Sequence, residues 1–291
     1  MIKIGVFGIA DETLPLLELL RRGRGYTITG LHFPDGPVPS GEGHPYPPTD
    51  DPEMLILRSD VLVFAAPAPA DLPFMGEALR RSRPLFLADT SRLDPPHLEQ
   101  VALLAAEAEV RVHCYDPLRD HPRFMQAAQT AGRILFAEVE RTFREGEGLR
   151  QQLTATLLYS LEAMLSLNPT RPRRPAVGAC LMPGREAIIH IQLLFDDGMT
   201  AVIRHESGPR ARQRCRLAGS RQTVQFDPST AGPHNLAAPL RHAALWHAWQ
   251  QLLSPHPDHP ETLEQRIEAL RLHRETLDQL RIRTPAHLTG K

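Results

Sequence analysis

Short apolar runs alternate with amphipathic segments from the N-terminus to about residue 115. The apolar runs have the length of strands, and the segments between them place leucines at the spacing of a helix face. Because strands and helices alternate in this way, the pattern predicts right-handed crossover units and a parallel sheet. The expected strands lie at 3–7, 26–33, 61–66, 85–88 and 110–115.

The pattern changes after about residue 125. A helix over 123–131 and a long apolar helix starting near 149 come before segments in which apolar and polar residues alternate. These segments are joined by Asp197-Gly198 and by Gly219-Ser220, which are natural hairpin turns. They predict an antiparallel sheet, followed by two helices near the C-terminus.

The two patterns together define the expected fold class, which is α/β. We predict a Rossmann-like, parallel-sheet domain of the NAD(P)-binding type over 1–120. We predict an α+β domain with a mainly antiparallel open sheet over 121–291, of the type used for substrate binding and dimerisation. A chain of 291 residues is long enough for both domains to bury a core of their own.

Composition excludes several classes of partner. The formal net charge is -1, so no overall field favours nucleic acid or an anionic membrane. No apolar run approaches the ~20 residues that cross a bilayer, and no signal-peptide pattern opens the chain. The three cysteines are few and far apart, which is typical of a reducing compartment. We therefore expect a cytoplasmic protein that binds neither nucleic acid nor membrane.

Lysine is almost missing from the chain. The only lysines are Lys3 and Lys291, although lysine and arginine together number 33. Arginine does not readily give up its proton, so it cannot replace a lysine that acts as an acid or forms a Schiff base. A mechanism that needs a lysine in the middle of the fold has no candidate.

Three stretches resemble the Gfo/Idh/MocA family of glucose-fructose oxidoreductases and inositol dehydrogenases. They are "SDVLVFAAPAPADLPFMGEAL", "YDPLRDHPRFMQAA" and "LLFDDGMTAVIRHES" with the following "RLAGSRQTVQFD". The resemblance implies an NAD(P)-dependent oxidoreductase with a Rossmann domain and a second, open-sheet domain. It implies that Ala66 and Pro67 pass under the nicotinamide ribose, and that two copies pair through the C-terminal sheet.

The first turn departs from the family's glycine-rich phosphate motif. Its glycine positions fall on Gly8, Ala10 and Thr13, and the carboxylates of Asp11 and Glu12 lie between them. Two carboxylates at the start of a helix suit the helix dipole but would repel a diphosphate. If a cofactor is bound, Gly8, Ala10 and Asp11 are the expected contacts. The alternative is an ordinary helix with acidic residues in its first turn.

The other site positions of the family also differ. Phe33 stands where the resemblance expects an acid for the adenosine ribose, and Asp35 could replace that acid only if its loop bends back. The family's Glu-Lys-Pro stretch falls on Ala88, Asp89 and Thr90. Its His-x-x-Asp pair falls on a helix segment that offers no general base near neutral pH, namely Gln151, Gln152, Thr154 and Thr156.

A polar pocket is still possible where the parallel strands end, because ligands of doubly wound sheets collect at that edge. His113 and Asp89 are the candidate catalytic residues, and the pocket would also include Thr90, Asp116 and His121. No metal site is predicted, because the cluster His256, Asp258 and His259 lacks a distant fourth ligand.

Two hypotheses follow, with the cofactor open between none and NAD(P). The first is a degenerate member of the family, a pseudoenzyme that binds a small-molecule ligand or acts as a regulatory or scaffold subunit, and forms a homodimer. The second is an active NAD(P)-dependent oxidoreductase that acts on a sugar-like or carbonyl substrate through atypical residues. A third hypothesis is a hydrolytic or metal-dependent activity in the cleft that the family uses for its cofactor and substrate.

Overall fold

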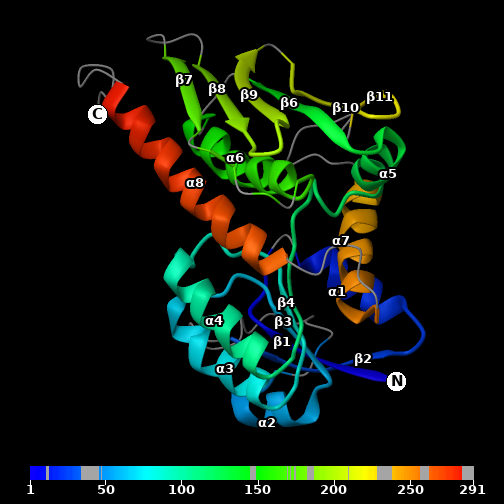
Figure 1. The fold of residues 1–291 in the computed structure, drawn as a ribbon. Coiled ribbons are helices and arrows are strands. Elements are labelled where there is room, and N and C mark those ends of the chain that lie inside the picture. The colour runs from blue at the N-terminus through cyan, green and yellow to red at the C-terminus, as the bar shows by residue number, and fades with distance from the viewer. Residues whose placement is uncertain are drawn as a thin grey trace. The chain divides into compact units, whose positions relative to one another are not determined.

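The computed structural model divides into two compact units (Figure 1). Unit 1 is Met1–Tyr115 with Leu245–Ile267, and unit 2 is Asp116–Ala244 with Glu268–Lys291. The structure describes residues 1–10, 13–33, 46, 48–144, 149–168, 170, 172–173, 175–181, 187–208, 210–227, 238–255 and 262–283.

Unit 1 is built on a parallel sheet of five described strands in the order β2-β1-β3-β4-β5. This order confirms the predicted Rossmann-like sheet. Beyond β2, where a dinucleotide-binding sheet has one more strand, the structure describes an isolated bridge between Leu31 and Pro48. The strands are β1 (Ile2–Phe7), β2 (Tyr26–His32), β3 (Val61–Phe64), β4 (Leu85–Leu87) and β5 (Val112–Cys114).

Helices cover both faces of this sheet. On one face α2 packs on β1 and β2, where the missing side chain of Gly5 leaves room for Ser59 and Leu62. On the other face the ring of Trp249 packs edge-on against Phe86, with centroids 5.9 Å apart. The helices are α1 (Leu14–Arg22), α2 (Pro52–Arg58), η1 (Pro69–Asp71), α3 (Leu72–Arg80), α4 (Pro95–Glu107) and α7 (Ala238–Leu253), of which Leu245 onward belongs to unit 1.

Unit 2 contains a mixed sheet in the order β11-β10-β6-β9-β8-β7. Only the β6–β9 pair is parallel among the described pairs, so the sheet is mainly antiparallel, as predicted. At the predicted hairpin turn Gly198 has a φ of +88°, which favours glycine. The strands are β6 (Ile134–Arg144), β7 (Ala176–Leu181), β8 (Ala187–Leu194), β9 (Thr200–Gly208), β10 (Arg212–Gly219) and β11 (Thr223–Phe226).

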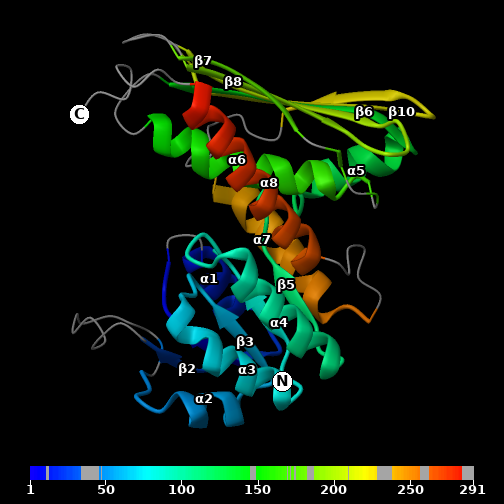
Figure 2. The same ribbon diagram turned by 60° about the vertical axis from the view of Figure 1, so that its left-hand side comes forward.

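The two faces of this sheet differ in chemistry. The inner face packs on α6 (Leu149–Leu165) and carries mainly apolar residues such as Val139, Ile203 and Leu217. Figure 2 shows the sheet nearly edge-on, with α6 along this face. Residues of α5 (Pro122–Ala131) and α8 (Thr262–Arg283) join the same core. The opposite, outer face carries charged residues.

None of the described helices is long and apolar enough to cross a membrane.

Candidate functional site

The turn between β1 and α1 uses its own hydrogen-bonding groups. The Thr13 hydroxyl accepts the N–H of Ala10 at 3.0 Å and donates to the Ala10 carbonyl at 2.8 Å. The N–H groups of Thr13 and Leu14 donate to the same carbonyl, and Pro15 has no N–H. Gly8 keeps the positive φ of a tight turn, +75°. The N–H groups of Ala10, Thr13 and Leu14, which would face a pyrophosphate, therefore have partners within the turn.

Aromatic rings gather where β1, β2 and β3 end. Phe7 and Phe64 are the last residues of neighbouring strands, and their rings stack with centroids 4.5 Å apart. His32, at the end of β2, contacts Phe7 and Phe74 edge-on. Phe33, which replaces the expected ribose acid, follows directly. Asp11 and Asp35, two of the predicted cofactor contacts, lie outside the described residues.

The segments after β3 and β4 lie at the carboxyl end of the sheet, as the sequence predicts. Ala66 and Pro67 follow β3, and the N–H of Ala65 donates to Phe7. After β4, the Asp89 carboxylate accepts the N–H and the hydroxyl of Ser91 at 2.9 and 3.0 Å. Asp89 thus forms a local turn in place of the family's lysine stretch. The neighbouring Thr90 is buried, and its hydroxyl has no partner among the described residues.

His113 lies within the sheet face. It is the middle residue of β5, and its ring stacks on Phe86 with an interplanar angle of 10°. Only 4 % of the residue is exposed. Because Phe86 also contacts Trp249, His113 belongs to the face that packs on α7. Its predicted catalytic role stays a prediction.

Asp116 and His121, the other members of the predicted polar pocket, belong to unit 2. His121 caps α5: its Nδ1 accepts the N–H of Arg123 at 3.1 Å, and its Nε2 has no partner among the described residues. Burial, with a smaller effect from Arg123, lowers the pKa of His121 to about 4. The ring is therefore neutral at pH 7, with its proton on Nε2.

A buried ion-pair network fixes the start of unit 2. The Arg119 guanidinium donates to both carboxylate oxygens of Asp120, at 3.2 and 3.0 Å, and to Glu162 of α6. Asp116 accepts the N–H groups of Leu118 and Arg119. Burial alone would lower the pKa of Arg119, but the carboxylates of Asp120, Glu162 and Asp116 raise it above its usual value. Arg119 is therefore fully paired.

A row of polar residues crosses the inner face of the unit 2 sheet. Gln213 of β10, Arg141 of β6 and His205 of β9 are register partners and are all buried. The side-chain oxygen of Gln213, in its satisfied orientation, accepts from Nε and Nη2 of Arg141 at 3.2 and 3.0 Å. The Nε2 of His205 lies 3.1 Å from the hydroxyl of Ser160 on α6. Burial lowers the pKa of Arg141.

The sequence analysis missed this polar row, although a signal was present. Arg141 stands in phase with Val139 and Phe143, at a position where the alternation of β6 calls for an apolar residue. His205 and Gln213 break the alternation of their strands in the same way.

On α6, Thr156 is buried, and the side chains of Gln151, Gln152 and Thr154 lie outside the described residues.

Metal ligands do not gather among the residues that the structure describes. No group of three or more His, Cys, Asp or Glu side chains there could hold a metal ion. The cluster at 256–259 lies outside the described residues.

Comparisons with known proteins identify the fold. No protein-family model and no curated protein sequence matches the chain. A myo-inositol dehydrogenase from Corynebacterium glutamicum has a similar structure, with a TM-score of 0.76 at 14 % identity over 98 % of this chain and 100 % of that one. A scyllo-inositol dehydrogenase from Lactobacillus casei, with bound NAD(H) and scyllo-inositol, gives 0.74 at 11 % identity over 96 % and 98 %.

A biliverdin reductase from Synechocystis, in complex with biliverdin and NADP+, gives a TM-score of 0.64 at 14 % identity over 95 % of this chain and 98 % of that one. The predicted resemblance to Gfo/Idh/MocA-type dehydrogenases is thus confirmed for the fold. At identities of this size the similarity establishes the fold alone.

The two buried arginines of unit 2 predict different responses to mutation. Arg119→Met should lower the free energy of unfolding by about 3–5 kcal/mol, because it leaves two buried carboxylates without a cation. Arg141→Met should lower it by only about 1–3 kcal/mol, because it removes the donors to the buried Gln213 oxygen but breaks no ion pair. Chemical denaturation followed by circular dichroism measures both values. Equal losses in the two variants would contradict this assignment.

His121 predicts a loss of stability in acid. Its folded pKa of about 4 lies below the ordinary 6.5, so the unfolded chain binds more protons between these values. Its contribution to stability is complete above pH 6.5 and falls by roughly 3 kcal/mol as the pH drops to 4. The free energy of unfolding should therefore change less across this pH range in His121→Asn, which keeps a cap for α5 but does not titrate. Denaturation curves recorded at several pH values measure this change. Identical pH dependence in both proteins would argue against a buried neutral His121.

Proposed function

We propose that this protein is a non-catalytic relative of the Gfo/Idh/MocA dehydrogenases that binds a small-molecule ligand in a regulatory or scaffold role. The observation that carries this proposal is the closed turn after β1. The N–H groups of Ala10, Thr13 and Leu14 are used within the turn, and Pro15 supplies none. A dinucleotide would have to break these bonds before its pyrophosphate could use any of these three donors.

The acid–base chemistry of the candidate site supports the same proposal. Hydride transfer to or from a carbonyl or alcohol needs a group that moves a proton at the reacting oxygen. The lysine position of the family holds Asp89, whose carboxylate is used in a local turn. In the helix segment expected to hold the His-x-x-Asp pair, the sequence has glutamine and threonine.

An active NAD(P)-dependent oxidoreductase is the second candidate function. It is favoured by the match over nearly the whole chain to structures solved with NAD(H) and with NADP+. Such an enzyme would bind its cofactor near Gly8, Ala66 and Pro67. It would use Asp89 or His113 as the proton-transferring group, with a sugar-like or carbonyl substrate.

Titration with NADH and NADPH, followed by energy transfer from the tryptophans, separates the two candidates. The proposal expects no saturable binding up to about 1 mM, the upper end of common substrate affinities. It also expects no transfer of labelled hydride from NADH or NADPH to a panel of sugar-like carbonyl compounds. Saturable binding with hydride transfer would overturn it. In that case Asp89→Asn, which keeps the turn but not the charge, and His113→Ala identify the proton-transferring residue.

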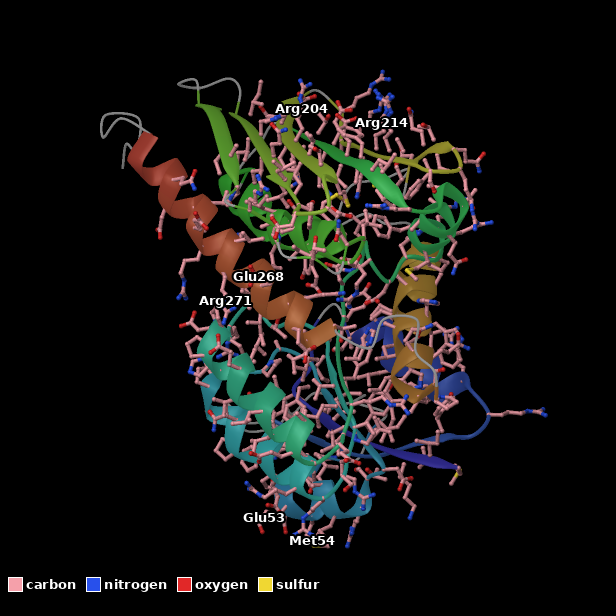
Figure 3. The ribbon with its side chains drawn as sticks, in the orientation of Figure 1. Glu53, Met54, Arg204, Arg214, Glu268 and Arg271 are labelled. Atoms are coloured by element: carbon pink, nitrogen blue, oxygen red, sulfur yellow. The ribbon has the colours of Figure 1, made fainter. Side chains whose placement is uncertain are left out.

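We also propose that this protein forms a homodimer. Its two copies would bind each other through the outer face of the unit 2 sheet. Figure 3 labels Arg204 and Arg214 on this face. Arg212, Arg214 and Arg216 of β10 alternate with inward residues, and β6 offers the outward carboxylates of Glu138 and Glu140. A two-fold axis between these strands would place the arginines of each copy over the glutamates of the other.

Charge reversal tests this dimer. Sedimentation should find that Arg214→Glu with Arg216→Glu, and separately Glu138→Arg with Glu140→Arg, dissociate a wild-type dimer because like charges then meet. Mixing the two variants should restore it, since each reversed strand then faces its opposite. A monomeric wild type, or a mixture that stays monomeric, would refute the arrangement.

We infer a cytoplasmic location. Cys114 and Cys215 are buried free thiols. Apolar cores and ion pairs stabilise the described part of the chain, and this kind of stabilisation suits a reducing compartment.

A further inference from the structure

Every described strand of the unit 1 sheet has a cation at or just before its start. In the order of the strands across the sheet, these residues are Arg24 before β2, Lys3 in β1, Arg58 before β3, Arg83 before β4 and Arg111 before β5. Neighbouring strands lie about 4.8 Å apart, so this basic row extends over about 19 Å. Four of its members are exposed, and Arg83 is partly exposed.

Main-chain hydrogen bonds fix the order of the basic row. The N–H of Ile2 donates to the carbonyl of Gly25 at 2.7 Å. The N–H of Asp60 donates to the carbonyl of Lys3 at 2.7 Å, and the carbonyl of Arg111 accepts an N–H from β4 at 3.0 Å. Because the sheet itself holds these segments side by side, the row exists without a ligand.

Most of the basic row is not neutralised. Four members form no ion pair with a described residue, namely Lys3, Arg24, Arg58 and Arg111. Arg83 faces Asp60 at 4.0 Å, and Arg111 donates one N–H to the carbonyl of Leu252 at 3.2 Å. The acidic residues in the segments that precede these strands are Asp60 and Glu109. This edge is therefore positive, although the net charge of the whole chain is -1.

Helix dipoles do not account for the basic row. A cation in the last turn of a helix offsets the partial negative charge of that end, and α1 and α3 already have Arg22 and Arg80 there. These two arginines also pair with a carboxylate of their own helix, Glu18 and Glu77 respectively. Of the row, only Arg58 lies in a last turn. The other members are surplus to the helices and are available to a partner.

We propose that the basic row docks an extended, acidic segment of a partner protein. Such a segment advances about 3.3 Å per residue and turns every second side chain to the same side, so about six residues cover the row and about three carboxylates face it. A guanidinium binds a carboxylate through two parallel N–H bonds. This inference rests on the proposed regulatory or scaffold function and names its partner.

A protein partner fits this edge better than a single-stranded nucleic acid. Binding of single strands combines phosphate contacts with aromatic rings on which the bases stack. The basic row contains no ring, and the nearest one in the sequence, Tyr26, packs edge-on against Trp246 and Trp249. Charge alone is offered at this edge, which suits carboxylates.

A labelled acidic peptide tests the docking. A peptide of about ten residues that alternates glutamate and serine is titrated with the whole chain, and fluorescence anisotropy measures binding. Exposed ion pairs are individually weak, so the expected Kd is on the order of 0.1 mM at low salt. Raising the ionic strength to about 0.5 M should weaken binding at least about fivefold. The same peptide with glutamine in place of glutamate should not bind.

Two double variants locate the binding surface. Lys3→Gln with Arg24→Gln, on neighbouring strands, should weaken peptide binding about three- to tenfold. Arg133→Gln with Arg173→Gln removes the same charge from exposed arginines of unit 2, so it should change the Kd less than about twofold. Circular dichroism checks that each variant unfolds cooperatively, which separates lost binding from lost folding.

Several results would overturn the docking of an acidic segment. These are the absence of saturable binding at low salt, equal binding of the glutamine peptide, and equal losses in the two double variants. Tighter binding of a single-stranded oligonucleotide of the same length would also overturn it, because the basic row would then recognise a nucleic acid.

Titration with NADH and an assay of hydride transfer, run in parallel, separate this inference from the proposed function. Peptide binding together with hydride transfer would keep the docking and remove the non-catalytic function. The absence of both would remove only the docking.

Discussion

Two hydrogen bonds between the Thr13 hydroxyl and the main chain of Ala10 close the turn on which the functional account depends. A dinucleotide-binding turn leaves its N–H groups open for a pyrophosphate, and its glycines let the ligand approach. Here the N–H groups of Ala10, Thr13 and Leu14 have partners within the chain. These bonds therefore stabilise the start of α1 without a ligand.

The same requirement, that buried polar groups find partners, divides the arginines of unit 2. Arg119 is held by Asp120 and Glu162, so it joins the start of the unit to α6. Arg141 donates to the amide oxygen of Gln213, and the Asp116 carboxylate acts on its charge. A fold can lose a phosphate site and still bind a partner elsewhere, because a binding site depends on particular side chains and not on the architecture.

The architecture could be predicted because it follows from local patterns. Short apolar runs between helices gave the parallel sheet, and Asp197-Gly198 marked a hairpin that the structure contains. The geometry of the candidate site could be predicted less well from the sequence. Whether Asp89 faces a ligand or bonds to Ser91 depends on one turn, and the burial of His113 depends on its stacking with Phe86 of the neighbouring strand β4. Arg141 was detectable as a charge in phase with core residues, but its bonds to Gln213 depend on tertiary contacts.

Hydrogen bonds close the turn after β1, and the proposed function requires that the turn stay closed when a cofactor is added. Amide hydrogen exchange at Ala10 and Leu14, measured with and without NAD+, tests it most directly. Protection at both amides that does not change when NAD+ is added is the result the structure predicts. Unprotected amides that become protected on adding NAD+ would contradict it.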